Sequence, residues 1–283
     1  MIKSDVKGTV KDSVFRDFFS HSKYALQLYQ AIHPEDVTVT ETDIGNVTIH
    51  NVFTNQEYND FGMTVRDKVL ILLEAQSTWS VNIIVRILFY LTHTWNRHLE
   101  TTKQNRYSST KVTLPKPEFY VLYTGERKTH PEWLHLSKEF FEEKNEYLEV
   151  SVKVLYGEGE TDILSQYVMF TKVYQEQVKL HGKTREAILE TIRICKDSNV
   201  LKEYLEAREK EVIDIMMSLF DQEKAVEQFG YEKMKEGEAK GRLEGIQQGI
   251  QETAKSLLLL GVEIEKISKA TGLSISELKV LSK

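Results

Sequence analysis

The sequence contains one cysteine, Cys195, and no long apolar segment. A single cysteine cannot form an intramolecular disulfide, so we expect Cys195 to fill a core position in a reducing compartment. No run of about 18 apolar residues is present to span a membrane. Residues 1–14 are polar and lack the apolar stretch of a secretion signal. These absences predict a cytoplasmic protein with no membrane partner.

The signatures of several enzyme classes are also missing. The sequence has no HExxH, Cys-x-x-Cys or Gly-x-Ser-x-Gly motif and no phosphate-binding loop, and its eight histidines are dispersed. The glycine-rich stretch around Gly241 follows no predicted strand, so it is not a dinucleotide-binding fingerprint. Zinc-protease, dithiol, serine-hydrolase and nucleotide-loop chemistries are therefore disfavoured.

The composition is that of a soluble globular protein. Of the 283 residues, 41% are hydrophobic, 10% aromatic and 28% charged, which leaves little room for disorder. The net charge of −6 argues against a chain that coats nucleic acid nonspecifically.

Hydrophobic periodicity predicts a mixed α/β protein. The predicted helices cover residues 12–32, 81–99, 162–179, 183–196 and 200–220, and the predicted strands cover 37–42, 46–53, 58–65, 69–76, 118–123 and 147–156. We expect three regions: a core at 1–160, a helical extension at 161–230, and a glycine-punctuated helix with a small helical element at 231–283.

Two carboxylates and an amide are predicted to meet on one hairpin. If the chain reverses at Asp67, Asp60 lies opposite Glu74, with Cβ atoms about 4.5 to 5.5 Å apart. Gln76 then shares the face of Glu74, whereas Ala75 points away. A two-residue turn would shift the register and weaken this pairing.

Facing carboxylates repel unless one is protonated or a cation lies between them. Oxygen ligands without a nearby cysteine or paired histidine favour Mg²⁺ or Mn²⁺ over zinc. The alternative is that Asp60 only ends a strand and Glu74 is exposed at a sheet edge. The apolar run of residues 69–73 favours a central strand instead.

A basic segment lies between His93 and Pro117. Its single acidic residue is Glu100, and its basic residues are Arg97, Lys103, Arg106, Lys111 and Lys116. The segment is either a docking surface for a phosphate backbone or a solvated loop.

The C-terminal region has glycines every four residues, at Gly237, Gly241, Gly245 and Gly249. Each costs a helix about 1 kcal/mol relative to alanine, so a close helix-to-helix contact in a homo-oligomer is one explanation and a flexible linker is the other. Residues 254–281 form short helices in a helix-turn-helix-like pattern, which indicates either DNA binding or self-association.

The predicted order is helix, strands, hairpin, long helix and apolar strand. It resembles the αβββαβ core of the PD-(D/E)XK nuclease superfamily, a restriction-endonuclease-like mixed sheet flanked by helices. Within that superfamily, residues 58–62, 69–77 and 86–90 and the glycine-punctuated C-terminal helix resemble the Rpn family of recombination-promoting nucleases and transposases. The resemblance covers about residues 8–125, and the tail loosely.

The resemblance implies a Mg²⁺- or Mn²⁺-dependent endonuclease that cuts double-stranded DNA in recombination or mobile-element movement. The implied metal ligands are Asp60, Glu74 and the carbonyl of Ala75, and the implied catalytic residues are Asp60, Glu74 and Gln76. Gln76 stands where the superfamily usually has lysine, so it orients the attacking water by hydrogen bonding and supplies no charge.

Further DNA contacts are expected outside the hairpin. Arg86 and Tyr90 share a helix face, and Arg86 either contacts phosphate or forms a structural ion pair. Arg97, Lys103 and Arg106 are the candidate contacts in the basic segment. Asp12 is expected to cap the first helix rather than bind metal. A noncatalytic DNA-binding or assembly protein, and a nuclease acting on RNA, are the alternatives.

Overall fold

The computed structural model describes residues 9–47, 61–66, 69–141, 143, 146–159 and 162–281. It divides into two compact units, residues 1–223 and 224–283. Each unit is described by itself.

The first unit contains a six-stranded mixed sheet with strand order β1-β2-β3-β4-β6-β5. Its strands are β1 (Ile44–Val47), β2 (Phe61–Val65), β3 (Val69–Gln76), β4 (Lys116–Tyr123), β5 (Trp133–His135) and β6 (Ser151–Leu155). The β1, β2 and β3 strands form an antiparallel meander, β4 and β6 run parallel to β3, and β5 is antiparallel to β6. The prediction of a mixed α/β protein is therefore confirmed.

The β2–β3 hairpin has the predicted register. Phe61 pairs with Leu73 and Val65 pairs with Val69, as expected for a reversal midway between residues 65 and 69. The apolar β3 strand lies between β2 and β4, where Ile71 and Leu73 are almost fully buried. An edge position for this strand is thereby excluded.

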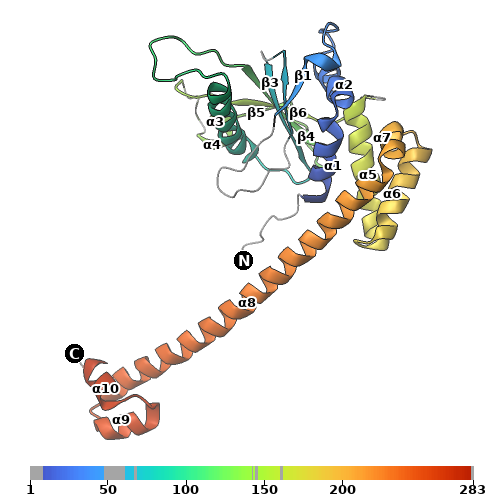
Figure 1. The fold of residues 1–283 in the computed structure, drawn as a ribbon. Helices are drawn as coiled ribbons and strands as arrows, with labels where there is room; N and C mark the ends of the chain where they lie inside the picture. Colours follow the sequence, from blue (N-terminus) through green and yellow to red (C-terminus); the bar gives the residue numbers. More distant parts are fainter. Residues whose placement is uncertain are drawn as a thin grey trace. The chain divides into compact units, whose positions relative to one another are not determined.

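Helices cover both faces of the sheet (Figure 1). On one face, α3 (Ile83–Thr101) packs Ile83, Ile84 and Ile87 against alternate residues of β4 and β6. The other face packs against α1 (Thr9–Ser20) and α2 (Ser22–Ile32). The same buried cluster extends into α5 (Ile163–His181), α6 (Arg185–Asp197), α7 (Lys202–Ala207) and the first turns of α8 (Glu209–Leu259). Because α3 connects two adjacent parallel strands, the carboxyl ends of β3 and β4 meet at one sheet edge.

The predicted helix over residues 12–32 is two helices. The helix is interrupted at His21, which has an extended backbone. This interruption lets the rings of Phe18 and Tyr24 stack with their centroids 4.4 Å apart. The helix is also longer at its start than predicted: Asp12 lies inside α1, which is already helical at Thr9, so Asp12 is not its cap.

Two other expectations about local structure were wrong, and two short elements were not predicted. Residues 37–42 form no strand, because the Thr40 and Asp43 side chains build a capping box around a 3-10 turn, Glu41–Asp43. The predicted helix at 200–220 is divided at Arg208 into α7 and α8. The short elements β5 and α4 (Leu136–Phe140) were not predicted.

The second unit contains the rest of α8 and two short helices, α9 (Ile264–Thr271) and α10 (Ile275–Leu281). The glycine-punctuated segment is continuous helix rather than a flexible linker. Gly272, at φ 75°, ends α9, and Ser274 and Glu277 form a capping box at the start of α10. Among the described residues, no helix has the length and apolar character needed to cross a bilayer.

Candidate active site at the carboxyl ends of β3 and β4

Gln76 ends β3 in a buried position. Only 8% of the residue is exposed, and it lies beside Tyr123 in the parallel register with β4. Its carbonyl oxygen accepts hydrogen bonds from the Thr124 backbone N–H at 2.7 Å and from the Thr124 hydroxyl at 3.3 Å. The backbone that carries Gln76 is therefore fixed to the end of β4.

The carbonyl of Ala75 points the other way. Successive carbonyls of a strand point to opposite edges, so when the Gln76 carbonyl is bonded to the β4 side, the Ala75 carbonyl faces the β2 side. The methyl group of Ala75 packs against the core cluster that contains residues of α1 and α5, as predicted for a residue on the face opposite Gln76. This direction suits a metal ion held between β2 and β3.

Of the two carboxylate residues that are predicted to bind metal, the structure describes only the backbone of Glu74. Asp60 lies outside the described residues, one position before β2. Glu74 lies on β3, where its backbone is beside Val121 of β4, and its side chain lies outside the description. The described residues contain no cluster of three or more His, Cys, Asp or Glu side chains that could hold a metal ion.

Arg86 and Tyr90 lie on α3, one helical turn apart, with different surroundings. Arg86 is half-buried in the first turn of the helix. Tyr90 is only 2% exposed and belongs to the cluster that packs α3 on the sheet. This burial favours a packing role for Tyr90 over contact with DNA.

The basic segment lies at the opposite end of the strands from Gln76. Lys116, which closes the segment, pairs with Val69 at the start of β3. Gln76 is seven residues further along β3, or about 23 Å at about 3.3 Å per residue. Arg97, Lys103 and Arg106 are exposed, and the fold does not bring them beside Gln76.

One cation that was not predicted from the sequence lies at this edge of the sheet. Arg127 follows β4, and its guanidinium carbon lies 3.5 Å from the ring centroid of Trp79, in the loop after β3. The Trp79 ring meets the Tyr123 ring edge-on at 5.3 Å. The available signal was the position of Arg127 just beyond a predicted parallel strand, where ligand sites of α/β sheets occur.

An aromatic row extends from this point toward β6. The ring of Tyr123 lies 6.2 Å from that of Tyr156, which in turn stacks on His130 at 4.5 Å. His130 pairs with Glu158 at 3.2 Å. Burial raises the pKa of Tyr156, and the positive charge of Arg127 partly opposes this shift.

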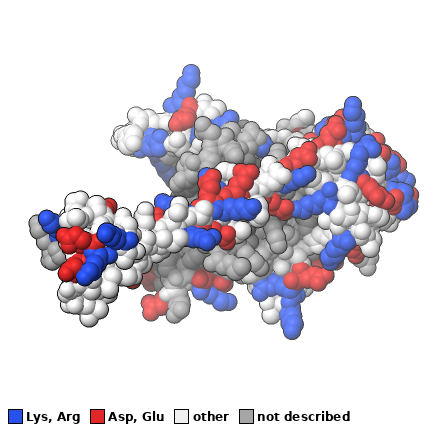
Figure 2. Space-filling view, turned by 90° about the horizontal axis from the view of Figure 1, so that it is seen from below, with Lys and Arg blue, Asp and Glu red and all other residues white. Residues whose placement is uncertain are grey.

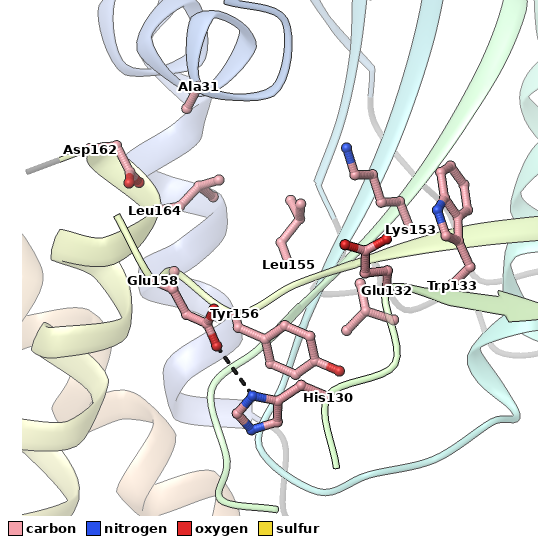
Figure 3. Close-up of a pocket in the computed structure, with 12 residues that line it drawn as sticks. Ala31, His130, Glu132, Trp133, Lys153, Leu155, Tyr156, Glu158, Asp162 and Leu164 are labelled. Atoms are coloured by element: carbon pink, nitrogen blue, oxygen red, sulfur yellow. Dashed lines mark ion pairs between the residues drawn. The ribbon is translucent and has the colours of Figure 1, made fainter. Parts of the chain in front are cut away.

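His130, Tyr156 and Glu158 also line a pocket of about 480 Å³ near the ends of β5 and β6. Figure 3 shows Lys153, Glu132 and Trp133 on another side of the same pocket. Its lining is mixed, with aromatic, acidic and basic groups.

Charges of both signs are interspersed on the face of the molecule shown in Figure 2. Among the described residues drawn there, no stripe of a single sign is visible.

Comparisons of the chain with protein-family models, curated proteins and solved structures found no match.

Proposed function

We propose that this chain is a metal-dependent endonuclease that hydrolyses phosphodiester bonds of double-stranded DNA, with its active site at the carboxyl end of β3. The observation that supports this most is the hairpin register, which continues to the last described pair, Phe61–Leu73. Glu74 is the next residue on β3, and Asp60 precedes β2 in the sequence. The proposed core is of the restriction-endonuclease-like type, and the proposed family is Rpn, with a role in recombination or mobile elements.

The donor set is all oxygen, which suits Mg²⁺ or Mn²⁺. Asp60, Glu74 and the Ala75 carbonyl would hold the ion. When bound, the ion supplies the charge that lowers the pKa of a water ligand and neutralises the phosphate.

Gln76 and Arg86 would act by orienting the attacking water and the phosphate. Gln76 is held by its bonded backbone, so its amide can orient the attacking water through one donor and one acceptor group. Arg86, in the first turn of α3, would contact a phosphate near the same strand end. A water oxygen then bonds to phosphorus, the bond to the leaving oxygen breaks, and that oxygen takes up a proton.

Cleavage of supercoiled plasmid tests the proposal. Wild-type protein with Mg²⁺ or Mn²⁺ should nick or linearise the plasmid, and chelation with EDTA should stop it. Glu74→Gln should abolish cutting, because it removes a metal ligand with little change in shape. The matched control is Glu211→Gln, which neutralises an exposed carboxylate on α8.

Two results would contradict the proposal. Cutting by Glu74→Gln at the wild-type rate would remove Glu74 from the active site. DNA binding by the wild type without cutting under any divalent metal would favour the noncatalytic alternative.

A further inference from the structure

Arg127 belongs to the short polar loop Thr124-Gly125-Glu126-Arg127-Lys128 that follows β4. The loop is tied to the end of β3, because Thr124 bonds to the Gln76 carbonyl. Gly125 lies against the Ser77 carbonyl so closely that no side chain fits between them. Arg127 is therefore held at the strand end that carries Gln76.

The guanidinium of Arg127 is arranged like that of an anion-binding arginine. Its face lies on the Trp79 ring, and stacking on an aromatic face leaves the in-plane N–H groups free for a planar anion. Nη2 donates to the Thr129 hydroxyl at 2.6 Å. His130 bonds to the Arg127 carbonyl at 3.1 Å and holds the loop in its turn.

One guanidinium nitrogen of Arg127 lacks a hydrogen-bond partner among the described residues. This nitrogen, Nη1, is buried. No carboxylate of the described chain forms an ion pair with this guanidinium, although Glu126 is its neighbour in sequence. A half-buried cation without a counter-ion and with a buried unpaired N–H costs folding free energy. Such a group is typical of a site that an external anion completes.

We propose that Arg127 binds a backbone phosphate of DNA at the edge of the active site. The identity of the anion as DNA rests on the proposed function, whereas the anion site rests on the geometry of Arg127 alone. Arginine binds phosphate through paired N–H groups, and Nη1 is the guanidinium nitrogen that lacks a partner among the described residues. The exposed cation Lys128 adds positive charge to the same loop.

Binding of a fluorescein-labelled DNA duplex, followed by anisotropy over a range of salt concentrations, tests this. The full chain carries Glu74→Ala throughout, so that the duplex stays intact. Replacing Arg127 with Gln should remove one phosphate contact, which lowers the slope of log Kd against log salt by about 0.9. Loss of this contact should also weaken DNA binding about eightfold in 0.1 M salt.

Two further variants separate charge from packing. Arg127→Met keeps an unbranched stem on the Trp79 ring but has no charge, and Arg127→Lys keeps the charge. We expect the Met variant to lose the phosphate contact and the Lys variant to retain most of the salt slope. The matched control is Arg193→Gln, because Arg193 is an exposed arginine on α6 already paired with Glu190 at 2.8 Å.

Equal binding and equal slopes for the Met and Lys variants would overturn the inference. An unchanged slope in Arg127→Gln would overturn it as well, since loss of packing alone releases no counter-ion. In a separate arm, stabilisation of the protein by inorganic phosphate without any DNA binding would overturn the assignment to DNA.

The two proposals can fail independently. If the wild type cuts plasmid and the Arg127 variants bind DNA normally, the inference fails and the endonuclease proposal stands. If no metal supports cutting but binding depends on Arg127, the endonuclease proposal fails and the inference stands.

Discussion

The backbone N–H of Thr124 donates a 2.7 Å hydrogen bond to the carbonyl oxygen of Gln76. This bond continues the β3–β4 pairing one residue beyond the last strand pair, Gln76 with Tyr123. It keeps the two loops that leave the sheet, after β3 and after β4, next to each other. Arg127 and Trp79 meet because of this contact.

Gly125→Ala should loosen this strand end. A β-carbon at residue 125 would collide with the Ser77 carbonyl oxygen and the Tyr123 ring, so we expect a loss of about 1–3 kcal/mol in the free energy of unfolding. Urea unfolding followed by circular dichroism measures the change. In contrast, Gly237→Ala has open space around it and should stabilise α8 slightly. An unchanged free energy of unfolding in Gly125→Ala would show that the two loops are not in tight contact.

Gln76→Ala should lower the rate of plasmid cleavage by about 100-fold, the usual effect of losing one orienting group. The metal requirement should persist, because the proposed ligands are unchanged. Single-turnover cleavage over a range of Mg²⁺ concentrations separates the two effects. If high Mg²⁺ restores the wild-type cleavage rate, Gln76 acts in metal binding and not in orienting water.

Acid should weaken the contact between α2 and β4. Burial pushes the pKa of Glu118 upward, but hydrogen bonds from His33 at 2.7 Å and Tyr120 at 3.0 Å outweigh it, so this pKa lies below its usual value. A carboxyl with a lowered folded pKa stabilises the protein above its unfolded pKa, about 4.3. That stabilisation is lost as the pH falls through the folded pKa.

Glu118→Gln should therefore reduce the free energy of unfolding at pH 6 by about 1 kcal/mol and flatten its dependence on pH below about 4.3. Denaturant unfolding at a series of pH values measures both. The exposed Glu211 provides the control, as Glu211→Gln should leave the acid dependence unchanged. An acid dependence identical in all three proteins would contradict the role of Glu118.

Cys195 should be inert in the folded protein. It is fully buried, and burial raises the pKa of its thiol to about 12, so the reactive thiolate is scarce at pH 8. Ellman's reagent should label native protein slowly and unfolded protein at once. Ser256→Cys, at an exposed position on α8, should add one rapidly labelled thiol. Rapid native labelling of the wild type would show that this part of the core opens readily.

We also propose that the glycine row of α8 packs against a second copy of the chain. Within the described residues, a β-carbon at Gly237, Gly241 or Gly245 would meet no atom within 4 Å other than those of its chain neighbours and of the helix's own backbone. The row is therefore open to close approach by another helix. Light scattering should find a dimer that Gly241→Leu dissociates. Glu238→Leu, one position beside the row, is the control. A monomeric wild type would contradict the proposal.

The elements that could be predicted are those whose signal is local. Five consecutive apolar residues identify β3 as an interior strand, and the short polar break before them fixes the hairpin register. The apolar stripe on α3 predicts both the helix and its buried face. The Ser274 cap of α10 follows from a short sequence motif.

The missed features have two different causes, a local side-chain bond and a pairing between distant strands. Residues 37–42 alternate like a strand, but the side chain of Asp43 bonds to the Thr40 backbone and turns the chain instead. The strand β5 has only three residues, and it forms because β6 offers a free edge. Local patterns carry no information about such pairings.

The sequence alone determined the register of the β2–β3 hairpin, because strand alternation and turn length are local properties. Tertiary structure decided which cations lie near the end of β3. The basic segment with Lys103 and Arg106 is rich in charge, but the parallel pairing of β3 with β4 places it at the far end of the strands. The same pairing brings Arg127 to the end that carries Gln76, because the carboxyl ends of adjacent parallel strands lie at one edge of the sheet.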